Sequence, residues 1–201
     1  MGIVTGGAPG SADRDEACSK LLDAADELFY ARGIQAVGVD QVRAASGVSL
    51  KRLYQCFPSK QDLVEAYLRR RDERWRAALA AHVREYPPQD RPPAVFDWLR
   101  AWLAETGTRG CAFINSFGEL GAIETGVAHA ARDHKQAVLR YLTELVADLD
   151  ARNAEVLAEQ LLLLVDGAIT TAAISGNPDA ALRARTAAET LVAAAKNRER
   201  S

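Results

Sequence analysis

The sequence has few aromatic residues and few cysteines, and both scarcities exclude classes of protein. Aromatic residues make up 6% of its 201 residues, whereas alanine is abundant, and this balance favours helices over sheets. The three cysteines, Cys18, Cys56 and Cys111, are widely spaced and odd in number. They form no readable disulfide framework and no Cys-x-x-Cys metal pair, so we expect a reducing, cytoplasmic location.

Signals for export or membrane insertion are also missing. The first residues, MGIVTGGAPGSADRDE, lack both a basic start and a long apolar core, which argues against a signal peptide. The longest apolar runs are far shorter than a membrane span, so we expect no membrane partner. The 48% hydrophobic and 26% charged residues are typical of a soluble globular protein. The net charge of −2 says nothing about partners.

Catalytic and metal-binding motifs are absent as well. The sequence contains no Gly-x-Ser-x-Gly, P-loop, dinucleotide fingerprint or His-Glu-x-x-His. His129 and His134 are five residues apart, a spacing that does not place two ligands on one helix face. We therefore expect no enzyme, no cofactor and no metal site. A redox role of Cys56 or Cys111 stays open, because sequence does not show a lowered thiol pKa.

Helical periodicity runs through most of the chain. Apolar residues recur at helical spacing over 15–31, and Gly33 stands where a C-terminal cap belongs. No segment alternates with period two for long enough to indicate a strand. The pattern predicts an all-α fold of about nine helices, at roughly 15–31, 39–45, 49–57, 60–85, 93–105, 110–120, 126–150, 153–175 and 178–197.

Two of these helices are short and joined by a tight turn. Ser46-Gly47 ends the first, and Ser49 is a good N-cap for the second. Pro58 ends the second helix, and Ser59 caps the next one, with an acid three residues later. Four residues of the second helix share one face, which predicts a packed stripe: Leu50, Leu53, Tyr54 and Phe57.

The opposite face of the second short helix carries three hydrogen-bond donors, Lys51, Arg52 and Gln55. Two short helices joined by a turn and preceded by a longer helix have the form of a helix-turn-helix, whose second helix enters the major groove of DNA. Arg and Lys suit guanine and Gln suits adenine, and a Lys at the next helix start suits a phosphate. Residues 32–60 hold five basic side chains against one acid, a local excess that the near-neutral total hides.

At this point the sequence resembles the DNA-binding domain of the tetracycline-repressor (TetR) family of transcriptional regulators. The shared elements cover about the first 70 residues: Leu28-Phe29, Gly33, Ala45-x-Gly47-Val48-Ser49, Leu53-Tyr54, Phe57 and Ser59-Lys60 with Leu63. The resemblance implies six contacts to double-stranded DNA: Ser49, Lys51, Arg52, Tyr54, Gln55 and Lys60. It also implies that the Tyr54 ring packs inward.

The chain departs from the family pattern at a few positions of this region. Val37 replaces a common Thr or Ser, Arg43 a small core residue, and Cys56 a His or Tyr. Asp40 stands where a phosphate contact is common, and we expect it to cap the first short helix instead. These departures affect the details of base recognition.

The C-terminal block predicts a dimer. Residues 161–176, LLLLVDGAITTAAISG, are apolar nearly all round the helix, so they need cover on more than one side. A symmetric partner subunit supplies such cover, and the alanine-rich last helix permits close approach. The expected interface is a four-helix bundle formed by the last two helices of each chain, which the resemblance also implies.

The resemblance further implies a pocket for an unidentified small-molecule effector in the C-terminal block. Such sites combine aromatic side chains with a few polar groups. Seven candidates meet this description, although each also fits an ordinary core position: Trp98, Trp102, Phe113, Asn115, Phe117, Asp166 and Thr170.

The predicted organisation is a flexible arm (1–13), a helix-turn-helix DNA-binding domain (14–60), a connecting helix (61–85), a ligand-sensing and dimerisation domain (86–197) and a tail (198–201). The predicted function is a ligand-responsive regulator, in first place a repressor that binds a palindromic operator as a dimer. The alternatives are an activator of the same fold and a helical oligomer whose DNA-binding motif has decayed.

Overall fold

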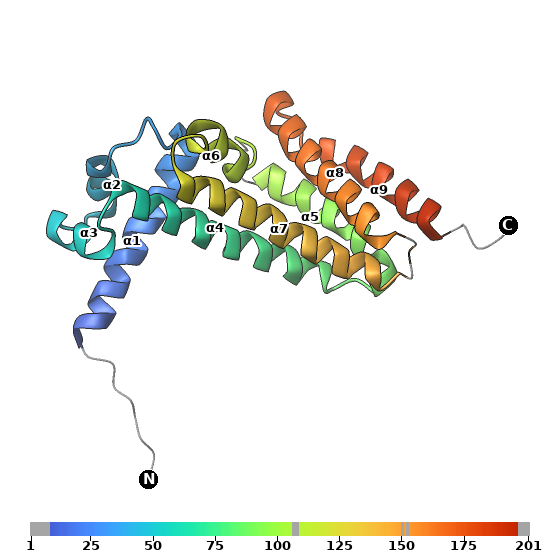
Figure 1. Ribbon diagram of the computed structural model, residues 1–201, viewed down its shortest axis with the longest axis horizontal. Coiled ribbons are helices and arrows are strands. Elements are labelled where there is room, and N and C mark those ends of the chain that lie inside the picture. Colours follow the sequence, from blue (N-terminus) through green and yellow to red (C-terminus); the bar gives the residue numbers. More distant parts are fainter. Residues whose placement is uncertain (1–8, 106–108, 150, 152, 197–201) are drawn as a thin grey trace, which may run out of the picture. The chain divides into compact units, whose positions relative to one another are not determined.

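The computed structural model describes residues 9–105, 109–149, 151 and 153–196. Over these residues the chain forms nine α-helices and no strand, which confirms the predicted all-α class (Figure 1). The helices are α1 (Pro9–Arg32), α2 (Val39–Ser46), α3 (Leu50–Cys56), α4 (Lys60–Val83), α5 (Arg91–Glu105), α6 (Ala112–Leu120), α7 (Thr125–Ala147), α8 (Ala154–Ser175) and α9 (Ala180–Lys196).

The described residues divide into two compact units. The first unit contains the residues up to Arg71 together with 116–130, and the second contains 72–115 and the residues from 131 onward. Helices α4, α6 and α7 therefore contribute residues to both units. The predicted division into functional domains stays a prediction.

Helix α1 begins earlier than the periodicity predicted. It starts at Pro9, so residues 9–13 of the predicted arm are helical, and residues 1–8 lie outside the described residues. Proline suits the first helical position, because its fixed φ matches the helix and its missing N–H needs no partner there. At the other end Gly33, with φ 87°, donates its N–H to the Phe29 carbonyl at 2.9 Å, which confirms the predicted C-cap.

The core of the first unit forms where α1 packs on α2, α3 and α4. Leu21, Ala25 and Phe29 of α1 are buried, as are Leu63 and Tyr67 of α4. The rings of Phe29 and Tyr67 meet edge to face at 5.5 Å between centroids. This arrangement holds α2 and α3 on a larger helical base.

Residues 116–130 join the first unit through polar contacts with the loop after α1. The Gln35 backbone N–H donates to Glu119 Oε2 at 3.0 Å, and Gln35 Nε2 donates to the Glu119 carbonyl at 2.6 Å. A Cβ on Gly33 would lie 2.9 Å from Glu119 Oε1. Glycine at position 33 therefore serves both the left-handed turn and the close approach of Glu119.

The second unit is built on α5, α8 and α9, which contact one another. Phe96 and Leu99 of α5 are buried, as are Leu161 of α8 and Ala184 and Ala188 of α9. The proline-rich segment before α5 contains a 3-10 turn at Pro88–Asp90. Helix α5 starts at Arg91, two residues before the predicted start, and its prolines occupy the first turn, where they are tolerated.

Helix α8 is long and apolar. By length and composition alone, Ala154–Ser175 is the one helix of the described residues that could cross a membrane, and about 39% of its most apolar window is buried within the protein. It packs on α5 and α9.

Candidate nucleic-acid interface

Helices α2 and α3 form the predicted helix-turn-helix. Gly47 ends α2 in the left-handed conformation, with φ 68°. The Val48 N–H donates to Ser46 Oγ at 3.3 Å, and the Val48 side chain is buried as predicted. Ser49 caps α3, because its Oγ accepts the Arg52 N–H at 3.3 Å. Each of these local features follows the sequence pattern.

The predicted apolar stripe of α3 is only half buried, which corrects two assignments. Leu53 and Phe57 lie in the core. Leu50 and Tyr54, however, are 49% and 50% exposed, so the Tyr54 ring does not pack inward as the resemblance implied. Helix α3 has seven residues and packs chiefly on α1. Because one neighbouring helix covers only part of the predicted stripe, two of its four residues stay exposed. The Tyr54 ring and hydroxyl are accordingly available on the outer surface.

Arg52 and Gln55, two of the three residues predicted to read bases, are bonded to each other and to α1. Arg52 Nη1 donates to Gln55 Oε1 at 3.3 Å, and Arg52 Nη2 forms an ion pair with the Asp13 carboxylate. Arg14 Nη2 donates to the Gln55 backbone carbonyl at 2.7 Å. The first turns of α1 thus contact the surface that would face DNA. Lys51 on the same helix is exposed.

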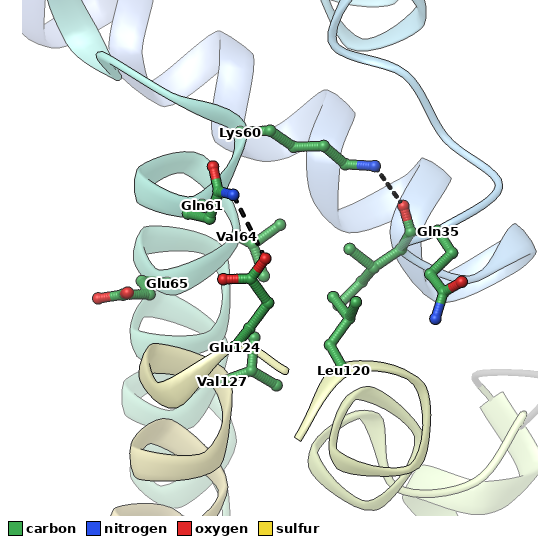
Figure 2. Close-up of a pocket in the computed structure, with 9 residues that line it drawn as sticks. Gln35, Lys60, Gln61, Val64, Glu65, Leu120, Glu124 and Val127 are labelled. Atoms are coloured by element: carbon green, nitrogen blue, oxygen red, sulfur yellow. Dashed lines mark hydrogen bonds between the residues drawn. The ribbon is translucent and has the colours of Figure 1, made fainter. Parts of the chain in front are cut away.

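Lys60, the predicted phosphate contact, is half buried at the start of α4. Its Nζ donates to the Ile34 carbonyl at 2.7 Å, and burial lowers the pKa of the ammonium (Figure 2). The Asp62 N–H donates to Ser59 Oγ at 3.1 Å, and the Ser59 hydroxyl donates to the Asp62 carboxylate at 2.6 Å. The predicted cap by Ser59 is therefore present, in a variant of the capping box in which the Asp62 carboxylate accepts from the Ser59 hydroxyl. This cap occupies part of the helix start that a phosphate would otherwise use.

Helix α2 is capped differently from the prediction. Its N-cap is Gly38, whose N–H donates to Gln41 Oε1 at 3.0 Å, and the expected cap by Asp40 is wrong. Asp40 lies in the first turn of α2 and forms an ion pair with Arg43 at 3.5 Å. An acid in a first turn stabilises the helix through the positive end of its dipole. Val37 is fully buried and serves the core.

Cys18 of α1 and Cys56 at the end of α3 form a disulfide, which the sequence pattern did not predict. Their Cα atoms are 5.5 Å apart, although 38 residues separate them along the chain. Both residues are half buried. Cys111 is a free, buried cysteine of the second unit.

A small cavity lies beside Lys60 within the first unit. Its volume is about 120 Å³, and its lining joins apolar residues with amides and carboxylates: Ile34, Gln35, Lys60, Gln61, Val64, Glu65, Leu120, Glu124 and Val127 (Figure 2). Gln61 Nε2 donates to Glu124 Oε1 across it at 3.3 Å. The cavity is smaller than the roughly 300–1,000 Å³ of typical ligand sites.

Two of the seven predicted pocket residues belong to an aromatic cluster in the second unit. The rings of Trp98 and Trp102 stack at 5.9 Å, and Trp75 meets them edge to face at 5.0 and 6.2 Å. Trp75 also meets the ring of His134 at 5.5 Å. The sequence has three tryptophans, and all three are in this cluster.

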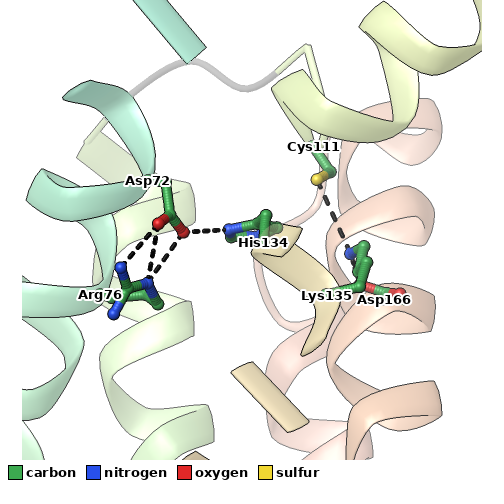
Figure 3. A network of polar contacts seen from close by, with 6 residues as sticks. All are labelled: Asp72, Arg76, Cys111, His134, Lys135 and Asp166. Atoms are coloured by element: carbon green, nitrogen blue, oxygen red, sulfur yellow. Dashed lines mark hydrogen bonds and ion pairs between the residues drawn. The ribbon is translucent and has the colours of Figure 1, made fainter. Parts of the chain in front are cut away.

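His134, whose ring meets Trp75 of the aromatic cluster, belongs to a partly buried polar network. Figure 3 shows the residues of this network. His134 Nδ1 is 2.7 Å from Asp72 Oδ1, and the guanidinium of Arg76 binds the same carboxylate. On its other side His134 stacks on Phe113, with ring centroids 3.7 Å apart. Lys135 forms an ion pair with Asp166 and lies 3.9 Å from the Cys111 sulfur.

Burial and hydrogen bonding compete in setting the pKa values of this network. Burial favours neutral Asp72, but the bonds from His134 and Arg76 prevail and lower its pKa to about 2. Burial also disfavours protonated His134, and the bonds to Asp72 and Cys111 prevail and raise its pKa. The Cys111 pKa is lowered, because His134 and the Lys135 charge outweigh burial. The network therefore favours a charged carboxylate beside a protonated imidazole.

The other predicted pocket residues differ in their surroundings. Asn115 is exposed and donates from Nδ2 to the Arg109 carbonyl at 2.7 Å, and Thr170 is exposed on α8. Phe117 belongs to the first unit and is 54% exposed. Phe113 and Asp166 take part in the contacts given above. The structure therefore groups Trp98 and Trp102 with each other, and the membership of the effector pocket stays a prediction.

The chain is similar to known regulators over its helix-turn-helix and over its whole length. Residues 21–67 match the family model described as "Bacterial regulatory proteins, tetR family". A crystal structure of a TetR-family transcriptional regulator from Streptomyces coelicolor is 30% identical, covers 91% of this chain and 97% of that one, and superposes with a TM-score of 0.84.

Two curated relatives match over a shorter segment. The HTH-type transcriptional activator FasR of Mycolicibacterium smegmatis is 47% identical over 57 residues, which are 28% of this chain and 26% of that protein. An HTH-type transcriptional regulator of Mycobacterium tuberculosis is 38% identical over 65 residues, 32% of each chain. The matched segments thus span about a quarter to a third of these relatives.

Proposed function

This chain belongs to the TetR family of bacterial transcriptional regulators, and we propose that it binds a palindromic operator as a homodimer and releases it when a small, largely apolar ligand binds. Membership of this family confirms the prediction that the chain is a DNA-binding regulator and not an enzyme. The DNA contacts, the dimer, the effector and the repressor mode are our proposals.

The proposal of base recognition rests on the outer face of α3. Lys51, Tyr54 and Gln55 are exposed there, and Arg52 is half-exposed beside them. The buried side chains of Leu53 and Phe57 fix the orientation of the helix, and Ser49 fixes its start. This leaves donors for base edges on one side, with Tyr54 able to reach a phosphate. A helix-turn-helix reads two half-sites about 34–36 Å apart, which requires a two-fold dimer.

The open faces of α8 and α9 support the proposed dimer. Leu163 and Ile174 of α8 are 73% and 84% exposed, an unusual state for apolar side chains of their size. Gly167 lies beside Leu163 in a shallow hollow that residues of α9 complete, and no atom lies within 4 Å of where its Cβ would be. Such a hollow suits an apolar side chain of the partner subunit.

A charge placed on this face tests the dimer. Leu163→Arg is expected to give a monomer in analytical ultracentrifugation, and to lose operator binding while it stays helical. Leu182→Arg, at an exposed position of α9 outside the residues that line this hollow, is expected to weaken the dimer less. A Leu163→Arg chain that remains dimeric would refute this interface.

The effector site is proposed in the second unit, around the tryptophan cluster and the network of His134. The cluster joins partly exposed aromatic rings to buried charges, a combination typical of small-molecule sites. A ligand that binds one arrangement of this unit better than another would shift the population of the DNA-binding state. Only such differential affinity couples the two events.

Tryptophan fluorescence tests the effector site directly, because the cluster holds all three tryptophans of the chain. Candidate apolar ligands are titrated while fluorescence and operator affinity are measured on the same samples. The expected result is a fluorescence change that saturates together with a loss of operator affinity. An operator affinity that stays constant when the fluorescence change is complete would refute the coupling.

Activation is the second candidate function, and similarity to FasR favours it. FasR is named as an activator and is 47% identical to this chain over 57 residues. The helix-turn-helix positions the protein on DNA, whereas the operator's place relative to the promoter decides the sign of regulation. A transcription assay with the chain's own upstream DNA separates the two: repression predicts less transcript from protein-bound template, and activation predicts more.

A further inference from the structure

We propose that the Cys18–Cys56 disulfide and the Asp13–Arg52 ion pair form a redox-controlled brake on DNA recognition. In the oxidised chain the start of α1 is fixed on α3 and its acid occupies the guanidinium of Arg52. Reduction frees α3 to read bases. This inference rests on the proposed role of α3 in DNA binding.

The covalent bond lies on the reading helix itself. Cys56 is the last residue of α3, next to Gln55 and four residues after Arg52. Helix α3 has few other anchors, because its buried side chain is Leu53, followed by Phe57 at the C-cap. A cross-link to α1 at this point therefore restricts the one element that must fit into the major groove.

The ion pair competes with a base for the same donors. Recognition of guanine by arginine uses two N–H groups of the guanidinium together. In the structure one amino group of Arg52 binds Asp13 and the other donates to Gln55 at 3.3 Å. A carboxylate at this position would also repel the phosphates of an approaching duplex. Asp13 thus opposes binding in two ways.

The disulfide strengthens the competition of the Asp13 carboxylate with DNA for Arg52. Exposed ion pairs contribute little on their own, and the Asp13 side chain is 68% exposed. Asp13 and Cys18 belong to the same helix, however, so the cross-link keeps the carboxylate close to Arg52 at a high effective concentration. The bond from Arg14 to the Gln55 carbonyl adds to the same contact. Without the cross-link, DNA competes with these exposed polar contacts alone.

The chemistry suits a switch. Disulfides in a reducing compartment are usually transient or redox-sensing, and both of these cysteines are partly exposed. The thiolate of a dithiol reductant attacks one sulfur, and its second thiol resolves the mixed disulfide. The chain then holds two thiols and the reductant is a cyclic disulfide. In reverse, hydrogen peroxide converts one thiolate to a sulfenic acid, which the second thiol attacks with loss of water.

The test compares oxidised and reduced full-length protein on a fluorescent duplex from the chain's own upstream DNA, at one salt concentration. We expect the dithiothreitol-reduced protein to bind about tenfold more tightly than the peroxide-oxidised protein, within the range of one bidentate arginine–guanine pair. Cys18→Ser/Cys56→Ser is expected to bind like reduced protein under both conditions. Arg100→Ala, at a surface ion pair of the second unit, is the control and should keep the full redox response.

Asp13→Asn separates a brake from a purely structural disulfide. It keeps the cross-link and removes the carboxylate, so oxidised Asp13→Asn should bind more tightly than oxidised wild type, with equal helicity by circular dichroism. Equal affinity of the two redox states, or tighter binding by the oxidised state, would overturn the brake while leaving the proposed function intact. Failure of every form to bind would overturn the proposed function and the brake with it.

Discussion

Two networks of charged side chains lie in the two units of this protein, and they differ in burial. In the first unit Asp13, Arg52 and Gln55 meet at the surface. In the second unit Asp72, Arg76 and His134 form a partly buried network, in which the Asp72 and His134 side chains are 17% and 4% exposed and the Arg76 side chain is 38% exposed. A surface pair exchanges its partner for water or DNA at little cost, whereas a buried charge that loses its partner has no replacement. The first network suits recognition and the second suits stability.

The largest expected effect is the loss of the Asp72 carboxylate. Asp72→Ala leaves the charges of Arg76 and His134 without their shared acceptor, so the free energy of unfolding should fall by about 3 kcal/mol. Urea denaturation followed by circular dichroism measures it. A loss of stability as small as that of a surface ion pair would contradict the proposed difference between the two networks.

Arg52→Ala is expected to act on binding rather than folding. Loss of a base-reading arginine should weaken specific operator binding by about 1–3 kcal/mol and leave binding to scrambled DNA nearly unchanged. Fluorescence anisotropy with both duplexes measures this. Arg100→Ala removes a surface arginine of the second unit, paired with Asp179 at 2.9 Å, and should bind like wild type.

Lys60→Ala should affect both properties. Lys60 donates to the Ile34 carbonyl, and loss of that bond should lower the free energy of unfolding by about 1 kcal/mol. If Lys60 also reaches a phosphate, binding should weaken about equally on specific and scrambled duplexes. Anisotropy titrations at several salt concentrations would then show a shallower salt dependence. An unchanged salt dependence would remove Lys60 from the set of DNA contacts.

The pH dependence of stability should report the buried network. The His134 pKa is raised above its unfolded value of 6.5, so its contribution is complete below that pH and is lost as pH rises through the folded pKa. Asp72 behaves in the opposite way: its contribution is lost as pH falls from 3.8 towards about 2. As pH rises above neutral, the urea midpoint of unfolding should therefore decrease more for wild type than for His134→Gln. Parallel pH profiles would contradict the raised pKa.

The smallest effect is expected at the surface pair of α2. The Asp40 side chain is 85% exposed and 3.5 Å from Arg43, so Asp40→Ala should change the free energy of unfolding by less than about 0.5 kcal/mol. The same urea denaturation serves as a control for Asp72→Ala. A loss comparable with that of Asp72→Ala would show that burial does not separate the two networks.

Features fixed by neighbouring residues could be predicted from the sequence, and long-range contacts could not. Gly33, Gly47 and the Ser49 and Ser59 caps depend on residues within a turn or two of the chain. The Leu50 and Tyr54 assignments failed because periodicity indicates a helix face but not how much of it a neighbour covers. The pattern placed α2 and its end correctly while missing Gln41 as the capping partner.

The candidate site shows the same division. Lys51, Arg52 and Gln55 were placed on one face of a helix by spacing alone. The bonds that hold Arg52 and Cys56 to α1 join residues 39 and 38 positions apart, so no local pattern contains them. The contacts between Gln35 and Glu119 span 84 positions. Such pairs depend on how the helices pack. The same packing decides whether Arg52 binds the Asp13 carboxylate or stays available to a DNA base.

The most direct test of the central claim is hydroxyl-radical footprinting of the upstream duplex with reduced full-length protein. A dimer that reads DNA through α3 predicts two protected half-sites with centres about 10–10.5 base pairs apart, or a multiple of that spacing, related by a palindrome. Arg52→Ala should lose this protection at the same protein concentration. Uniform cleavage of the duplex at saturating wild-type protein would contradict the account.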